Sequence, residues 1–202
     1  PLTPLQQGFL FHALYDRSVD DSYLVQMSFS LEGTLDAAAL RAAADAALRR
    51  HASLRAGFAH QKLREPVQVI HREVAAPWRE HDFSAMEPAA RDAALEALLR
   101  EDRTTHFDLM RPPLLRFELV RLAPERHCLV FTSHHILLDG WSSPILLEEL
   151  FALYRDPRAL DGLPPPPPYA DYMRWLAGRD RAAARTAWAQ ALEGVESGSR
   201  IA

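Results

Sequence analysis

The chain has 202 residues, 48% hydrophobic and 25% charged, and its 23 basic and 27 acidic side chains give a net charge of −4. This composition is typical of a folded globular domain and excludes a disordered, collagen-like or disulfide-rich chain. A mildly acidic chain without a basic block is not built mainly to bind nucleic acid or an anionic membrane. Cys128 is the single cysteine and no apolar run approaches 18 residues, so we expect a cytosolic protein. Because the chain begins on Pro1 without a methionine, we expect it to be a piece of a longer protein.

The first predicted element is a helix that begins at Pro4 and ends near Tyr15. Thr3 can cap this helix, Pro4 suits the first helical position, and Gln6 stands three residues after the cap. Apolar residues then alternate over 23–31, which predicts a strand.

The middle of the chain mixes helices with short strands. An alanine-rich helix capped by Asp36 is predicted to end near Arg50. Two strands, over 54–60 and 66–71, are expected to form a hairpin, and Pro88 opens another helix.

Two longer strands are predicted over 114–122 and 127–133. The second is apolar on both faces, which is typical of a central strand covered from both sides. After the polar turn at 139–140, one of the serines at 142–143 is expected to cap a helix started by Pro144.

Five consecutive prolines at 164–168 predict a stiff, extended connector. Helices are expected beyond it, over 169–176 and 180–192. We therefore expect three parts: a lobe over 1–163, the connector, and a helical segment over 169–202.

The residues that point to chemistry follow the central strand. His134 and His135 are followed, after three apolar residues, by Asp139 and Gly140. Adjacent strand residues face opposite sides, so at most one of the histidines shares a pocket with the turn. Imidazole can accept a proton near neutral pH, a carboxylate can orient it or its loop, and glycine lets a ligand approach the backbone.

Two other chemistries fit this segment poorly. A metal site on His134, His135 and Asp139 requires two diverging rings to converge, and no established zinc-ligand spacing occurs in the sequence. A serine hydrolase is disfavoured because the segment around Ser142 lacks the second glycine of the Gly-x-Ser-x-Gly turn.

At this motif the sequence resembles the condensation domains of nonribosomal peptide synthetases, in the chloramphenicol acetyltransferase-like superfamily. Residues 1–12 resemble the first conserved segment of that family, and residues 50–58 resemble the second. The resemblance covers residues 1–192 and implies an α/β (α+β) lobe with a mixed β-sheet and packed helices. Ala56 departs from the threonine found in many members.

The resemblance also implies roles for single residues. His135 faces the reaction centre, where it either deprotonates the attacking α-amine or positions it by a hydrogen bond. His134 and Asp139 are structural parts of the active site, and Arg55 is expected to hold Asp139 in an ion pair. Gly140 lies against the substrate or the thiol arm of a carrier.

The implied function is amide-bond formation between a donor peptidyl or aminoacyl thioester and the α-amine of an acceptor aminoacyl thioester. Donor and acceptor carrier proteins bring the phosphopantetheine arms, and no directly bound cofactor or metal is implied. The first segment and the residues before Asp139 resemble domains that take a donor ending in a D-residue.

Two alternatives within the superfamily stay open: an epimerisation domain, and a non-catalytic module that recruits a carrier or an enzyme. Ser143 and Pro144 stand where epimerisation domains usually have a tryptophan after the serine. Family members pair two lobes, and this chain resembles the N-terminal lobe. Because the reaction needs both walls of a cleft, we expect the chain to be inactive without the C-terminal lobe.

Overall fold

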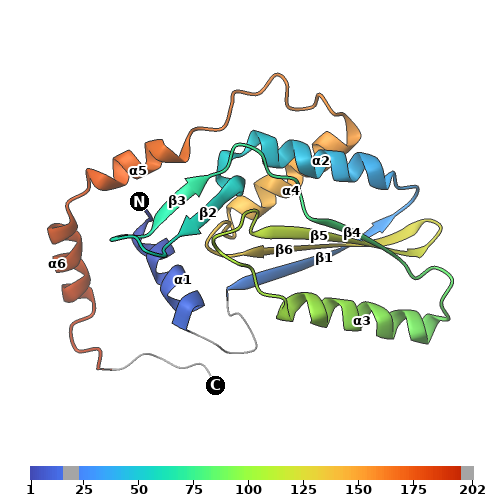
Figure 1. The fold of residues 1–202 in the computed structure, drawn as a ribbon, viewed down its shortest axis with the longest axis horizontal. Helices are drawn as coiled ribbons and strands as arrows, with labels where there is room; N and C mark the ends of the chain where they lie inside the picture. Colours follow the sequence, from blue (N-terminus) through green and yellow to red (C-terminus); the bar gives the residue numbers. More distant parts are fainter. Residues whose placement is uncertain (16–22, 197–202) are drawn as a thin grey trace. The chain divides into compact units, whose positions relative to one another are not determined.

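The computed structural model describes residues 1–15 and 23–196, and its elements are shown in Figure 1. The chain divides into two compact units, Pro1–Pro167 and Pro168–Ala202. The division falls within the proline run, because a segment without regular hydrogen bonding makes few contacts. The assignment of the parts to a lobe, a connector and a leading helical segment stays a prediction.

A four-stranded mixed sheet, in the order β1-β6-β5-β4, forms the centre of the first unit. Its strands are β1 (Leu24–Glu32), β4 (Trp78–Asp82), β5 (Leu115–Ala123) and β6 (Arg126–His134). β6 pairs antiparallel with both β1 and β5, whereas β4 pairs parallel with β5. Since β6 lies inside the sheet and is buried from His127 to its end, its prediction as a central strand is confirmed.

Helices cover both faces of this sheet (Figure 1). α2 (Ala37–Arg50) and α4 (Ser142–Arg155) pack on one face, and α3 (Pro88–Thr104) packs on the other. Side chains alternate along β6, so Leu129 and Phe131 join the α2 and α4 core while Val130 joins the α3 core. Each face of β6 therefore has its own hydrophobic core.

A third core lies where the first helix meets a second, smaller sheet. α1 (Pro4–Tyr15) contributes Leu10, and the pair β2 (Ala56–Ala59) and β3 (Val67–Ile70) contributes Phe58. The single turn η1 (Ala52–Arg55) leads into β2. Ile136, just after β6, belongs to the same core, so α1 packs against the segment that carries the candidate site.

The second unit contains α5 (Tyr169–Ala177) and α6 (Arg181–Ala191). Neither helix has a buried residue. Asp180 caps α6 by accepting from the backbone N–H groups of Ala182 and Ala183, each at 2.9 Å. Both helices were expected from the sequence, and their existence is confirmed.

The structure confirms most of the predicted elements and adds two, β4 and η1, the latter where the strand predicted over 54–60 was expected to begin. The predicted capping pair of α1 is present, with Gln6 N donating to Thr3 Oγ1 at 3.1 Å and Thr3 N donating to Gln6 Oε1 at 3.0 Å. Asp36 caps α2 by accepting from the N–H of Ala39. Strand β4 was not predicted, because its sequence has only one apolar residue, Trp78, and lies at the sheet edge.

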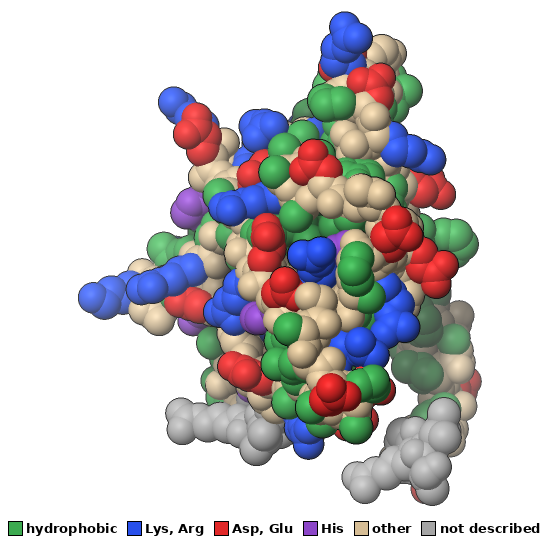
Figure 2. Space-filling view, turned by 90° about the vertical axis from the view of Figure 1, so that its right-hand side faces the viewer, with side chains coloured by type: hydrophobic (Ala, Val, Ile, Leu, Met, Phe, Trp, Pro, Cys, Tyr) green, Lys and Arg blue, Asp and Glu red, His purple; other side chains and the backbone are tan. Residues whose placement is uncertain are grey.

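The face of the protein that Figure 2 draws carries charges of both signs. Figure 2 shows basic and acidic side chains interspersed across it, without a patch of one sign. A surface of this kind does not concentrate a field on a polyanion. Over residues 1–15 and 23–196, no helix is both long and apolar enough to cross a bilayer.

Candidate active site

The candidate residues lie where β6 ends and α4 begins. His134 is the last residue of β6, and the turn from His135 to Trp141 leads directly into α4 at Ser142. Strand, turn and helix thus bring two histidines, a carboxylate and a glycine into one short segment, as the motif predicted.

His134 points into the protein and is fully buried. Its Nδ1 lies 3.0 Å from the backbone nitrogen of Ile136, which can only donate. Nδ1 must therefore carry no hydrogen, so the ring is neutral and its hydrogen is on Nε2. The structural role that the resemblance implied for His134 stays a prediction.

His135 has the opposite arrangement. Its ring Nδ1 lies 2.9 Å from the carbonyl oxygen of Leu138, which can only accept, so Nδ1 carries a hydrogen. In the neutral ring the lone pair is then on Nε2. The side chain is half-buried, and its backbone N–H donates to the Tyr23 carbonyl at 2.7 Å, fixing the residue to the start of β1. His135 thus offers one defined proton-accepting nitrogen.

Asp139 organises the turn and the start of α4. Its Oδ1 accepts from the backbone N–H of Trp141 at 3.1 Å, and from the N–H and hydroxyl of Ser142 at 2.8 and 2.7 Å. These bonds, led by that of the Ser142 hydroxyl, lower the pKa of Asp139. The expectation that Ser142 or Ser143 caps the helix is corrected: the carboxylate supplies the acceptor, and α4 begins two residues before Pro144.

The expected ion pair between Arg55 and Asp139 is wrong for this structure. Arg55 Nη1 donates to the carbonyls of Leu48 and Arg49, at 2.5 and 2.7 Å, and its Nε donates to the carbonyl of His71 at 3.0 Å. The last carbonyls of a helix lack partners within it and attract a cation. Arg55 therefore stabilises the end of α2 and joins it to the residue that follows β3, and no Arg55–Asp139 contact occurs among the described residues.

Gly140 and Trp141 form the open side of the turn. A Cβ placed on Gly140 would meet no atom within 4 Å, and the φ angle of this glycine is not in the left-handed region. The side chain of Trp141 is 87% exposed. Nothing inside the described chain requires a glycine at 140 or covers the indole, so both residues are available to a ligand or another part of a larger protein.

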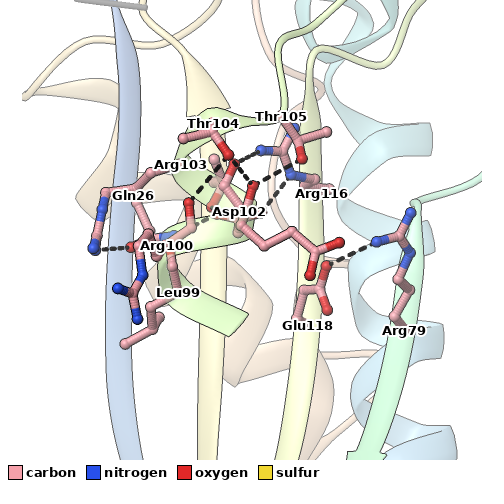
Figure 3. A network of polar contacts seen from close by, with 12 residues as sticks. Gln26, Arg79, Leu99, Arg100, Asp102, Arg103, Thr104, Thr105, Arg116 and Glu118 are labelled. Atoms are coloured by element: carbon pink, nitrogen blue, oxygen red, sulfur yellow. Dashed lines mark hydrogen bonds and ion pairs between the residues drawn. The ribbon is translucent and has the colours of Figure 1, made fainter. Parts of the chain in front are cut away.

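A buried polar network that the sequence did not predict lies on the α3 side of the sheet (Figure 3). Asp102 accepts from Arg116 Nε, Thr132 Oγ1 and Gln26 Nε2, each at 2.5 Å, and its carboxylate is 1% exposed. Thr132 precedes His134 by two residues and faces the same side of β6. The network therefore ties α3 to three strands beside the buried histidine.

One signal in the sequence could have identified Asp102. It lies in the last turn of α3, where the helix dipole disfavours a negative charge. A carboxylate at that position calls for a cationic or hydrogen-bonding partner. Arg116 supplies the charge, and its guanidinium also lies 4.4 Å from the ring centre of Phe107.

The residues around the turn do not form a metal centre. No group of three or more histidine, cysteine, aspartate or glutamate side chains is placed to hold a metal ion within the described ranges. The two histidines use their Nδ1 atoms in local hydrogen bonds of opposite sense. The arrangement can instead accept a proton or a hydrogen bond at His135 and display an open backbone turn beside it.

Comparisons with known proteins identify the family. The family model described as Condensation domain matches residues 1–201. A linear gramicidin synthase of Brevibacillus parabrevis is 38% identical over 205 residues, which cover the whole chain and 4% of that synthase. The chain thus matches a small part of a much longer relative.

Solved structures give the same answer. The EpoB cyclization-docking bidomain of a nonribosomal peptide synthetase from Sorangium cellulosum superposes with a TM-score of 0.79 at 27% identity, covering 92% of this chain and 36% of that one. The X-domain solved in complex with OxyB, from teicoplanin biosynthesis, superposes with a TM-score of 0.76 at 26% identity, covering 100% and 45% of the two chains. The predicted fold class is therefore confirmed, and the chain belongs to the condensation-domain family of nonribosomal peptide synthetases.

Proposed function

We propose that the domain to which this chain belongs forms an amide bond between two carrier-bound thioesters. The α-amine of an acceptor aminoacyl thioester attacks the carbonyl carbon of a donor peptidyl or aminoacyl thioester. The C–N bond forms, the C–S bond breaks, and the proton lost by the amine balances the one gained by the departing thiol. Family membership and the relation to a linear gramicidin synthase support this reaction.

The observation that carries the proposal is the geometry of His135. Its Nδ1–H is bound to the Leu138 carbonyl, so Nε2 is the nitrogen that accepts a proton or a hydrogen bond from the attacking amine. Asp139 fixes the turn through the start of α4 and is assigned no contact with substrate. Gly140 provides open backbone along which a substrate or a phosphopantetheine arm can lie.

The partners of this reaction are a donor and an acceptor carrier protein, which supply the phosphopantetheine arms, and the C-terminal lobe of the same domain. No cofactor held by the chain itself is proposed. The donor is assigned a D-configured last residue, on the resemblance of the first segment and of the residues before Asp139. The chain alone is proposed to be inactive, and it spans only 36% and 45% of the two matched solved chains.

The test uses the whole condensation domain with donor and acceptor carriers loaded separately, and follows the amide product by mass spectrometry. His135→Ala is expected to lower the single-turnover rate by about 100-fold or more, because a positioned acid or base contributes that much. His71→Ala is the matched control, since its side chain is exposed. A folded His135→Ala domain that works at the unsubstituted rate would overturn the proposal.

The same assay separates the alternatives. Loading the donor carrier with D- and then L-configured donors tests the assigned stereochemistry. An epimerisation domain would invert the bound residue without making an amide, and a recruiting module would bind carriers or an enzyme without either product. The likeness to the X-domain solved with OxyB motivates the last arm of the test.

A further inference from the structure

A second contact holds the ring of His135 besides its hydrogen bond. Phe9, on α1, stacks on the imidazole with ring centres 5.4 Å apart and planes inclined by 20°. Offset stacking at this separation is a favourable aromatic geometry. The contact joins the first conserved segment of the chain to the histidine motif, which is more than 120 residues away in sequence.

The two contacts constrain different motions of the ring. The bond from Nδ1 to the Leu138 carbonyl favours the Nδ1–H tautomer only while the ring keeps its alignment, and by itself this bond lets the ring rock. The face of Phe9 sets the plane of the ring. Together they fix the direction of the Nε2 lone pair, and proton transfer depends on that direction as well as on distance.

Phe9 is itself held from several sides. Tyr23 packs edge-on against it, with ring centres 4.8 Å apart and planes at 61°. The capping pair of Thr3 and Gln6 fixes the start of α1, and Leu10 anchors the helix in the core that also contains Ile136. The stacking surface is therefore rigid relative to the turn that carries His135.

We infer that Phe9 is a positioning residue for His135: its ring sets the plane of the imidazole and so aims Nε2 at the attacking amine. This inference rests on the proposed function for its kinetic consequence, but its structural content concerns the tautomer and orientation of one ring. Neither Phe9 nor Tyr23 is assigned any contact with substrate.

The test compares Phe9→Leu and Phe9→Met, which remove the ring, with Phe9→Tyr, which keeps it. Phe11→Leu is the matched control, because Phe11 lies on the same helix but is 55% exposed and stacks on Tyr15. Each variant is made in the whole condensation domain, and thermal unfolding first identifies those that fold.

The kinetic arm measures amide formation with loaded carriers. Losing the ring is expected to lower kcat about tenfold, because a displaced catalytic group loses alignment. KM for the acceptor carrier is expected to change by less than about twofold, since Phe9 is assigned no contact with the acceptor. Both Phe9→Tyr, which keeps the ring, and Phe11→Leu should have the kcat of the unsubstituted domain. Equal kcat values for Phe9→Leu, Phe9→Met and Phe11→Leu in folded domains would overturn the inference.

The spectroscopic arm separates failure of the inference from failure of the proposed function. The ¹⁵N signals of the His135 ring should report a single Nδ1–H tautomer in the unsubstituted domain and a mixture of tautomers in Phe9→Leu. If the domain makes no amide but this change occurs, the proposed function fails and the positioning role stands. An unchanged ¹⁵N pattern in both ring-less variants would sink the positioning role whatever the activity.

Discussion

The histidine motif has a side behind it that faces the protein interior and a side in front of it that faces solvent. The two sides differ in the contacts that hold their residues in place. Behind the motif, His134 is fully buried and Asp102 receives three hydrogen bonds of 2.5 Å from three different strands. In front of it, His135 is half-buried, a side chain at Gly140 would meet nothing, and Trp141 is 87% exposed. The residues on the first side are held by contacts within the described chain, whereas Gly140 and Trp141 on the second side face open space. Substitutions behind the motif should therefore act on stability, and substitutions in front of it on activity.

Asp102→Ala should produce the largest loss of stability. It leaves the Arg116 guanidinium, 12% exposed on its side chain, without its carboxylate, and such a buried charge costs about 3–5 kcal/mol of unfolding free energy. Denaturant unfolding of the whole domain measures this loss. Asp92→Ala is the control on the same helix, because the Asp92 side chain is 78% exposed. A change below about 1 kcal/mol in Asp102→Ala would contradict the importance of the network.

A pair of glycine substitutions compares a buried, crowded glycine with the exposed glycine of the motif. A Cβ on Gly57 would lie 2.9 Å from Cδ of Pro112 and 3.0 Å from the carbonyl oxygen of Met110. Gly57→Ala should therefore cost about 1–3 kcal/mol of unfolding free energy. Gly140→Ala should stay within about 0.5 kcal/mol of the unsubstituted domain while lowering amide formation. Equal losses of stability at both glycines, measured by thermal unfolding, would remove the distinction.

A double-mutant cycle tests the separate roles of Arg55 and Asp139. Asp139→Ala removes the acceptor at the start of α4 and should cost about 1 kcal/mol. Arg55→Ala removes the cap on the end of α2 and should cost about 1–3 kcal/mol. The two losses should add to within about 0.5 kcal/mol, because the side chains share no contact. A coupling energy above about 1 kcal/mol would restore the ion pair that the sequence suggested.

The smallest expected effect is a dependence of the unfolding free energy on pH that comes from His127, the second residue of β6. Burial, with a contribution from Arg121, lowers the pKa of His127. The unfolded chain then takes up a proton at His127 before the folded chain does. The stability that the neutral ring contributes is present above its unfolded pKa and is lost as the pH falls through the folded value.

Unfolding midpoints between about pH 7.5 and 5 check this effect, a range that spans the ordinary histidine pKa. The unfolding midpoint of His127→Gln should fall less steeply with decreasing pH than that of the unsubstituted domain. The control is His71→Gln, whose exposed side chain should leave the slope unchanged. Parallel slopes for His127→Gln and the unsubstituted domain would show that His127 contributes no pH dependence.

Local signals predicted most of the fold. The capping residues Thr3 and Asp36 located two helices, and the apolar pattern of β6 located the central strand. β4 escaped prediction because Arg79, Glu80, His81 and Asp82 are polar, and because this edge strand has no fully buried residue to give an apolar pattern. Its identity depends on parallel pairing with β5, a contact that residue spacing does not report.

The site was predictable as far as it is local. The order of the two histidines, Asp139 and Gly140 placed the turn correctly, since strand, turn and helix are contiguous in sequence. The partner of Arg55 was not predictable. A long arginine side chain can reach several acceptors, and only the fold decides which of them lie near it. The partners of Asp102 come from strands 14 to 76 residues away, so the sequence carried only the hint of a carboxylate at a helix end.

The protonation pattern of the two adjacent histidines tests the assignment of His135 Nε2 as the proton acceptor. A ¹⁵N spectrum of the histidine rings in the whole condensation domain, assigned with His134→Gln and His135→Gln, reads each tautomer separately. Opposite tautomers are expected at neutral pH: hydrogen on Nε2 for His134, and hydrogen on Nδ1 with a bare Nε2 for His135. A His135 ring with its hydrogen on Nε2 would contradict this assignment, because Nε2 could then not accept the proton of the attacking amine.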